Sequence, residues 1–274
     1  MGTVNIAVFG DVVGRPGRET LARHLGEFRR RYKLDAVIIN GENLSHGYGL
    51  TRKHAEEMTA LGVDVITGGN HSFDKKEIVE LFDTYPVIRP VNLPADAPGK
   101  GVYRTQVGGY PFAVVNVMGH FGMPMVDNPF TAALQTIETL RQEGYKHIVV
   151  DMHAEATAEK YVLLHLLKDN VSAILGTHTH VGTDDLQIIH GCAYVTDIGL
   201  TGCRDGVIGM DKEVPMRRAL TAVGGHMDVP KTCKTVAQAI VVELHPDGRC
   251  ASAYKVKLYD DETHHVTLAF REGL

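Results

Sequence analysis

The chain alternates short apolar runs with longer segments of helical periodicity, and this alternation limits the folds that it can adopt. Six apolar runs have the length and composition of buried strands, and they lie at 4–9, 35–39, 63–67, 112–117, 147–150 and 172–175. The first three recur at intervals of roughly 30 residues, the length of a βαβ unit. Because crossovers between parallel strands are right-handed, the ends of these three strands are expected at one edge of one sheet. The sequence predicts an α/β fold.

Helical segments follow most of these runs, and the helices are predicted at about 17–33, around 55–61, from 74 to about 85, at 131–144 and at about 159–169. In the fourth helix, Leu134, Ile137 and Leu140 are expected to face inward. Asp74 and Glu77 have the spacing of a capping box. We therefore interpret Asp74 as a helix cap rather than a catalytic carboxylate.

The last third of the chain has a different pattern. A strand at 193–196 and a hairpin at 240–259 are expected to be antiparallel. The segment 199–235 has weak periodicity and many turn residues, so it is predicted to be a cap or excursion near the active site. With 274 residues, the chain is expected to form a single domain, 1–274, rather than two equal ones.

Charge and cysteine content restrict the class of protein. The formal net charge of −5 argues against a protein that coats long nucleic acid. The four cysteines have no CxxC spacing, so neither a disulfide framework nor a zinc knot is predicted. No signal peptide is evident, and the apolar runs are too short to cross a membrane. A reduced, cytoplasmic setting is expected.

Polar residues with metal-binding or acid–base chemistry follow the predicted strands. They are Asp11, Glu42, Asn43, Asn70, His71, His153, His178 and His180. Ligands bind at the carboxyl ends of strands in open α/β sheets, so these residues are expected to form one site. A dinucleotide fingerprint at Gly10, Gly14 and Gly17 is disfavoured by its spacing and by Pro16.

The ligand types indicate a metal-dependent phosphoesterase. Carboxylate, amide and imidazole groups without thiolate suit Fe, Mn, Co or Zn. Without His71, the set is too large for one zinc and fits two ions that share a carboxylate. Only Asp11 and Glu42 are anionic, so two divalent ions would leave about two positive charges. Such a site favours an anionic phosphate ester and a metal-activated hydroxide as nucleophile.

The same motifs resemble those of the calcineurin-like metallophosphoesterase superfamily. They are Gly10-Asp11, Gly41-Glu42-Asn43, Gly69-Asn70-His71, His153 after a strand, and Gly176-Thr177-His178-Thr179-His180. Two departures from the usual pattern, Val13 in place of a histidine and Glu42-Asn43 in place of Gly-Asp, resemble the bacterial YmdB-like branch. Gly10-Asp11-Val12-Val13-Gly14 and Asp151-Met152-His153-Ala154-Glu155 are similar to that branch as well.

This resemblance implies a four-layer αββα sandwich, with two mixed sheets flanked by helices. It also implies a dimetal phosphodiesterase acting on cyclic nucleotides, 2',3' or 3',5'. Asp11, Glu42 and His180 would hold one metal ion. Glu42, as the bridging ligand, would hold the other ion together with Asn43, Asn70, His153 and His178. The resemblance implies iron.

His71 is assigned as the general acid. Its neighbour Asn70 is engaged by metal, so the imidazole is expected beside the phosphate without being a ligand, where it can protonate the leaving ribose oxygen. The alternative is that His71 only orients a ligand or packs the turn. His24, His54, His165 and His190 are expected to be surface or hydrogen-bonded core residues. His46 and Arg204 lie closer to the expected site, and their roles are left open.

Three functions remain open from the sequence. The leading one is a phosphodiesterase for a small substrate such as a cyclic nucleotide. The second is a phosphomonoesterase or nuclease on the same site, and the third is a non-catalytic metal-binding signalling protein. A membrane partner is not expected, and a homo-oligomer is left open.

Overall fold

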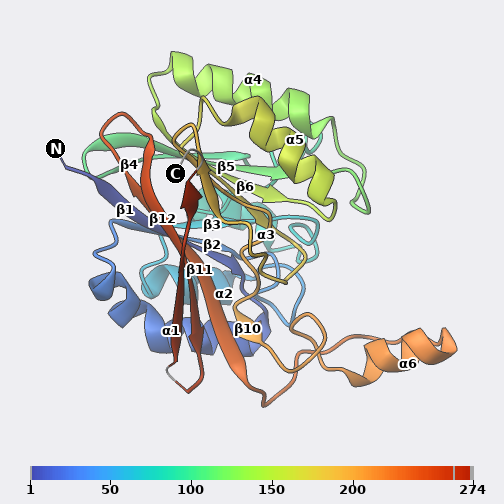
Figure 1. The fold of residues 1–274 in the computed structure, drawn as a ribbon. Coiled ribbons are helices and arrows are strands. Elements are labelled where there is room, and N and C mark those ends of the chain that lie inside the picture. Colours follow the sequence, from blue (N-terminus) through green and yellow to red (C-terminus); the bar gives the residue numbers. More distant parts are fainter. Residues whose placement is uncertain (1, 262, 272–274) are drawn as a thin grey trace.

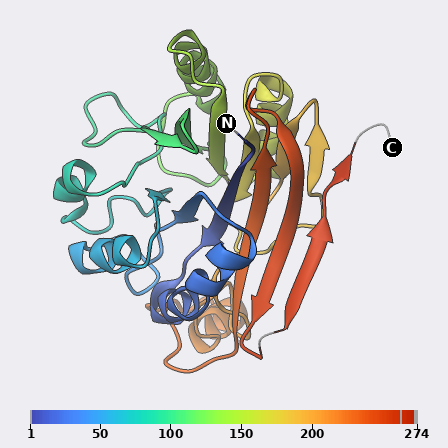
Figure 2. The same ribbon diagram turned by 90° about the vertical axis from the view of Figure 1, so that its left-hand side faces the viewer.

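The computed structural model describes residues 2–261 and 263–271. Two sheets face each other, and helices cover their outer faces (Figures 1 and 2). Within the described residues each sheet has seven strands. The predicted four-layer αββα sandwich is confirmed.

The first sheet combines the three parallel strands from the start of the chain with antiparallel strands from its end. Its strands are β1 (Val4–Asp11), β2 (Ala36–Asn40), β3 (Val65–Thr67), β10 (Gly202–Cys203), β11 (Thr235–Leu244), β12 (Cys250–Tyr259) and β13 (His264–Leu268). The order is β13-β12-β11-β1-β2-β3, with β10 paired to β11. β1, β2 and β3 are parallel neighbours, as the spacing predicts, and β11 and β12 form the predicted hairpin.

The second sheet is built from the middle of the chain. Its strands are β4 (Val102–Val107), β5 (Tyr110–Met118), β6 (His147–His153), β7 (Ala173–Thr177), β8 (Gln187–Ile189), β9 (Cys192–Val195) and β14 (Phe270–Arg271). The order is β14-β8-β9-β7-β6-β5-β4. β9 is antiparallel to β8 but parallel to β7, so the expectation of a purely antiparallel strand at 193–196 was half right.

Helices bury the outer face of each sheet. α1 (Gly14–Arg31), α2 (Arg52–Ala60) and α3 (Ile78–Thr84) pack on the first sheet through residues such as Leu25, Met58 and Leu81. α4 (Pro129–Gln142) and α5 (Thr157–Leu167) pack on the second sheet. Ile137 and Leu140 face inward as predicted, but Leu134 is 41% exposed, because Ala133 takes the buried position next to it.

The largest shared core lies between the sheets. Ile6, Val8 and Ile38 from the first sheet contact a set from the second sheet that includes Val149 and Leu175, all fully or almost fully buried. Burial of this kind stabilises the fold by about 1.5–3 kcal/mol per large aliphatic side chain. This core also holds the ends of the two sheets next to each other, and it thereby positions the side chains that follow those strands.

The capping-box interpretation of Asp74 and Glu77 was wrong. α3 begins at Ile78, and its first-turn amides receive no side-chain cap from Glu77. Glu77 instead accepts a hydrogen bond from the amide of Arg52 at the start of α2. Asp74 accepts a hydrogen bond from the His71 imidazole, with 2.7 Å between Asp74 Oδ2 and His71 Nδ1.

Between β10 and β11 the chain leaves the sandwich and returns. We call residues 204–234 the arm. It carries α6 (Glu213–Thr221), which has no buried residue and projects away from both sheets in Figure 1. The base of the arm contacts the body, where Met210, Met227 and Val229 pack with Val13 and Tyr48. No helix in the described ranges is long and apolar enough to cross a membrane.

Candidate metal centre

The predicted site residues meet where both sheets end. Asp11 is the last residue of β1, and Glu42 and Asn70 follow β2 and β3 in the first sheet. His153 ends β6 and His178 follows β7 in the second sheet. The three strand ends from the first sheet lie together as the βαβ spacing predicts. The histidines reach them from the opposite sheet, which periodicity alone does not indicate.

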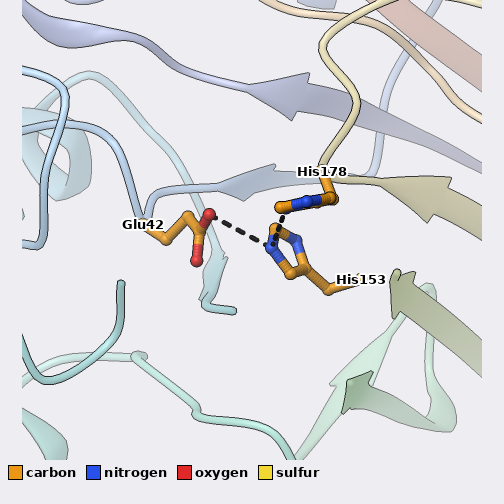
Figure 3. Close-up of side chains that lie close together, drawn as sticks. All are labelled: Glu42, His153 and His178. Atoms are coloured by element: carbon orange, nitrogen blue, oxygen red, sulfur yellow. Dashed lines mark hydrogen bonds and ion pairs between the residues drawn. The ribbon is translucent and has the colours of Figure 1, made fainter. Parts of the chain in front are cut away.

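His153 lies at the centre of this group. Its Nε2 atom is 3.1 Å from Glu42 Oε1, 2.9 Å from Asn70 Oδ1 and 3.1 Å from His178 Nδ1. Ligand atoms of Glu42, His153 and His178 all lie within 4.8 Å of one another. Figure 3 shows Glu42 and the two imidazoles pointing toward one another. Carboxylate, amide and imidazole donors therefore converge on one small volume.

Asp11 lies beside this group and has an unsatisfied oxygen. The residue is fully buried, and Oδ1 has no hydrogen-bond partner among the described residues. That oxygen is 3.7 Å from His180 Nε2 and 3.9 Å from His153 Nδ1. A buried acceptor without a donor costs about 1–3 kcal/mol, and more when it is charged. A cation between Asp11 and His180 would remove this cost.

Asn43 also has a buried oxygen atom without a hydrogen-bond donor among the described residues. Its Nδ2 donates to the carbonyl of Gly47 at 2.9 Å, whereas Oδ1 is buried and unpartnered within the described part of the chain. The amide oxygen, the atom that binds hard cations, is thus the one left without a partner.

Hydrogen bonds fix which nitrogen each histidine can offer. Thr177 Oγ1 donates to Asp151 at 2.6 Å, so it accepts from His153 Nδ1 at 2.9 Å. His180 Nδ1 donates to the carbonyl of Ile208 at 2.7 Å. Both bonds use Nδ1, so Nε2 is the ring nitrogen that faces the cluster, the arrangement found in metal-bound histidines.

His178 is oriented in the opposite way. Its Nε2 lies 3.1 Å from Glu155 Oε2, which leaves Nδ1 facing His153. Asp151, Thr177 and Glu155 were not predicted to have a role in the site. Their positions within the Asp151–Glu155 and Gly176–His180 motifs were the available signal.

A glycine makes room for this cluster. A Cβ atom on Gly69 would clash with Glu42 Oε2 and with the His153 ring. The backbone of the Gly68–Asn70 turn can therefore approach the carboxylate only because this position has no side chain.

The pKa values differ sharply across the cluster. Burial, opposed by His180 and His153, raises the pKa of Asp11 to about 6. Burial also acts to raise the pKa of Glu42, but His153 outweighs it and lowers that pKa to about 2. Burial and the charge of His153 lower the pKa of His178 to about 3. Glu42 is therefore anionic and His178 neutral at physiological pH, the forms that bind metal.

His71 lies at the open side of the cluster. Its backbone amide donates to Glu42 Oε2 at 2.9 Å, and its Nδ1 donates to Asp74. The ring contacts Tyr48 edge-on, with the ring centroids 5.1 Å apart, and the side chain is 28% exposed. Nε2 is left as the nitrogen for an external partner.

The remaining histidines have ordinary surroundings. His54 is buried and bonded to Ser45, His165 is exposed, and His190 pairs with Asp169. His46 is exposed and adopts a positive φ of 57°.

Arg204, whose role the sequence left open, has partners of its own. It pairs with Asp260 at 3.4 Å and lies over the ring of Tyr259.

Known proteins share this sequence and fold. The model of the YmdB-like protein family matches residues 7–256. The chain is 40% identical to the 2',3'-cyclic-nucleotide 2'-phosphodiesterase of Bacillus subtilis (strain 168), over 93% of this chain and 96% of that protein.

Two crystal structures are also similar. A phosphatase from Mycoplasma pneumoniae has a TM-score of 0.88 and 30% identity, over 94% of both chains. A hypothetical protein from Thermus thermophilus has a TM-score of 0.86 and 36% identity, over 97% of this chain and 100% of that one. The chain belongs to the YmdB-like family of phosphodiesterases and phosphatases, and it has the metallophosphoesterase fold.

Proposed function

We propose that this protein is a dinuclear metal-dependent phosphodiesterase that hydrolyses small phosphodiesters such as 2',3'- or 3',5'-cyclic nucleotides. The observation that carries the proposal is the buried, unpartnered Asp11 Oδ1 beside imidazoles whose Nε2 atoms are turned toward the cluster by hydrogen bonds at Nδ1. Such an arrangement is costly in a metal-free protein and favourable around cations.

We assign the ligands to two sites, as the family resemblance implies. Asp11, Glu42 and His180 would hold one ion, and Glu42 would bridge to a second ion held by Asn43, Asn70, His153 and His178. Bound ions would supply Lewis acidity for the phosphate and would lower the pKa of a water. Iron is the metal that the family resemblance favours, and Mn, Co and Zn suit the same ligands.

His71 would act on the leaving group. Asp74 accepts from Nδ1, so Nε2 is the nitrogen that would face the departing ribose oxygen and deliver a proton to it. The hydrogen bond from the His71 backbone amide to Glu42 fixes the backbone of His71 relative to the ligands. His71 would thus be held close to the reacting phosphate by two contacts.

The name of the Bacillus subtilis relative supports a cyclic nucleotide as substrate. The description of the Mycoplasma pneumoniae structure as a phosphatase favours a second candidate, a phosphomonoesterase. The ligand set serves both reactions, because it contacts phosphate rather than the organic part of the substrate.

Turnover of matched substrates by metal-loaded protein tests the proposal. We expect a 2',3'-cyclic nucleotide to be cleaved at least tenfold faster than the corresponding nucleoside monophosphate, and we expect a chelator to abolish both rates. Faster turnover of the monophosphate would establish the second candidate. Undiminished cleavage after complete metal removal would contradict both.

A further inference from the structure

A second group of potential metal ligands lies at the neck of the arm, where the chain leaves β10 and returns to β11. Cys203 is the last residue of β10 and pairs in register with Thr235 of β11. Cys233 precedes that strand by two residues. The two sulfurs and a carboxylate oxygen of Asp205 all lie within 4.8 Å of one another.

Hydrogen bonds orient two of the three groups, Cys203 and Asp205. Cys203 Sγ donates to Asp205 Oδ1 at 3.2 Å, and the amide of Lys234 donates to the same oxygen at 3.1 Å. The amide of Arg204 donates to the carbonyl of Lys234 at 2.8 Å, and this hydrogen bond joins the outgoing and returning segments of the neck. The carboxylate is thereby held against the sulfur of Cys203.

One side of this group is buried in the sheet, and the other side faces solvent. Cys203 is 1% exposed, whereas Cys233 is half-buried and Asp205 is exposed. An ion could enter from the solvent side and meet a sulfur that is fixed in the sheet. The other two cysteines, Cys192 and Cys250, are buried in separate strands.

We propose that Cys203, Asp205 and Cys233 bind one thiophilic divalent cation, of which zinc is the best match. Two thiolates and one carboxylate suit zinc, and three protein ligands leave a fourth position for water. Arg204 and Lys234, adjacent in sequence to these ligands, would offset the negative charge of three anionic groups. The candidate metal centre contains no sulfur, so the two sites differ in chemistry as well as place.

An ion at the neck would also act on that centre. Ile208, four residues after Arg204 in the arm, accepts the hydrogen bond that orients His180. Tyr48 lies beside His226 on the returning chain, with their ring centroids 5.8 Å apart. A metal ion that joins the two segments of the neck would restrict the motion of the arm where it contacts the sandwich.

Cobalt substitution tests this site independently of catalysis. Reduced, metal-free protein would be titrated with Co²⁺, and thiolate-to-cobalt charge transfer in the near ultraviolet would be recorded. Only sulfur ligands give this absorption, so the sulfur-free centre is silent. We expect saturation at one thiolate-bound ion per chain, loss of the absorption in Cys233→Ser, and displacement of Co²⁺ by Zn²⁺.

Two further variants complete the design. Cys250→Ser removes a cysteine from β12 and should keep the full absorption, whereas Asp205→Asn should weaken Co²⁺ binding at least tenfold while both sulfurs remain. Zinc should raise the Tm of the Cys250→Ser protein more than that of Cys233→Ser. Absence of charge transfer in the unmodified chain would overturn the proposal. So would equal absorption in Cys233→Ser, or formation of a Cys203–Cys233 disulfide when reduced protein is exposed to air in the presence of Zn²⁺.

Discussion

Asp11 combines complete burial with a carboxylate oxygen that has no hydrogen-bond donor in the described structure. Burial raises the pKa of Asp11 from the ordinary 3.8 to about 6, because the metal-free interior disfavours the charged carboxylate. An unfolded chain ionises this group near pH 4, and the folded chain only near pH 6. When no metal is present, the free energy of unfolding therefore falls as the pH rises from about 4 to about 6.

Asp11→Asn should thus stabilise the metal-free protein and harm the metal-bound one. At pH 7.5 we expect the metal-free variant to gain on the order of 2 kcal/mol in unfolding free energy, because the buried charge is gone. At pH 4 this gain should vanish. Denaturant unfolding at both pH values, with and without metal, measures the effect. A variant that is less stable at pH 7.5 without metal would show that Asp11 is satisfied in another way.

Glu42→Gln should remove most of both metal ions. Glu42 lies 3.1 Å from His153 Nε2 and holds the His71 amide, so it is the carboxylate placed to bridge two sites. The amide that replaces it is neutral and binds transition metals weakly. Elemental analysis of Cys233→Ser protein, which lacks the proposed site at the neck, should show close to two ions per chain, and Glu42→Gln is introduced into that protein. One ion per chain, or full loading of the variant, would rule out the dinuclear arrangement.

His71→Ala should separate substrates by their leaving groups. A positioned acid contributes about 10²–10⁴-fold when the leaving oxygen is strongly basic, as in ribose. We expect that loss for a cyclic nucleotide, and less than a tenfold loss for a nitrophenyl phosphodiester whose leaving group departs without a proton. Metal content should not change. Equal losses on both substrates would indicate that His71 only orients the turn.

At the scale of elements, the sequence predicted the strands better than their partners. Alternating apolar runs gave β1, β2 and β3 and placed Asp11, Glu42 and Asn70 at one edge, because parallel crossovers have a fixed hand. Nothing in the local pattern shows that β6 and β7 belong to a different sheet facing that edge. That arrangement depends on core contacts such as those of Ile38 with the second sheet.

Two further contacts were missed, one local and one between distant segments. Asp74 resembles a helix cap in sequence, yet it accepts from His71. Cys203 and Cys233 have no motif spacing, and only the pairing of β10 with β11 brings them together.

The link between β6 and β7 gives a prediction at this scale. Asp151, on β6, accepts from Thr177 on β7, and this bond makes Thr177 an acceptor for His153. Thr177→Val keeps the shape but removes the acceptor, so we expect metal affinity to fall about 10–100-fold with the fold intact. Calorimetric metal titration measures this. Thr196→Val, a buried threonine bonded to Asp185 instead, is the matched control and should keep its affinity. Equal metal affinities in the two variants would show that the Thr177 hydroxyl does not contribute to metal binding.

The charge of the whole molecule bears on which phosphodiester it accepts. A net charge of −5 repels a long polyanion, whereas the candidate metal centre would attract one phosphate at short range. We predict a kcat/KM for a 2',3'-cyclic mononucleotide at least tenfold higher, per scissile bond, than for a single-stranded RNA of about 20 nucleotides at low salt. Added salt should raise the RNA rate by screening repulsion and should change the mononucleotide rate little. A uridine dinucleotide serves as the control, because it offers the RNA linkage without the repeated charge, and it should be cleaved faster per bond than the RNA. An RNA rate that exceeds the mononucleotide rate and falls with added salt would reveal a basic path to the site and would contradict the preference for small substrates.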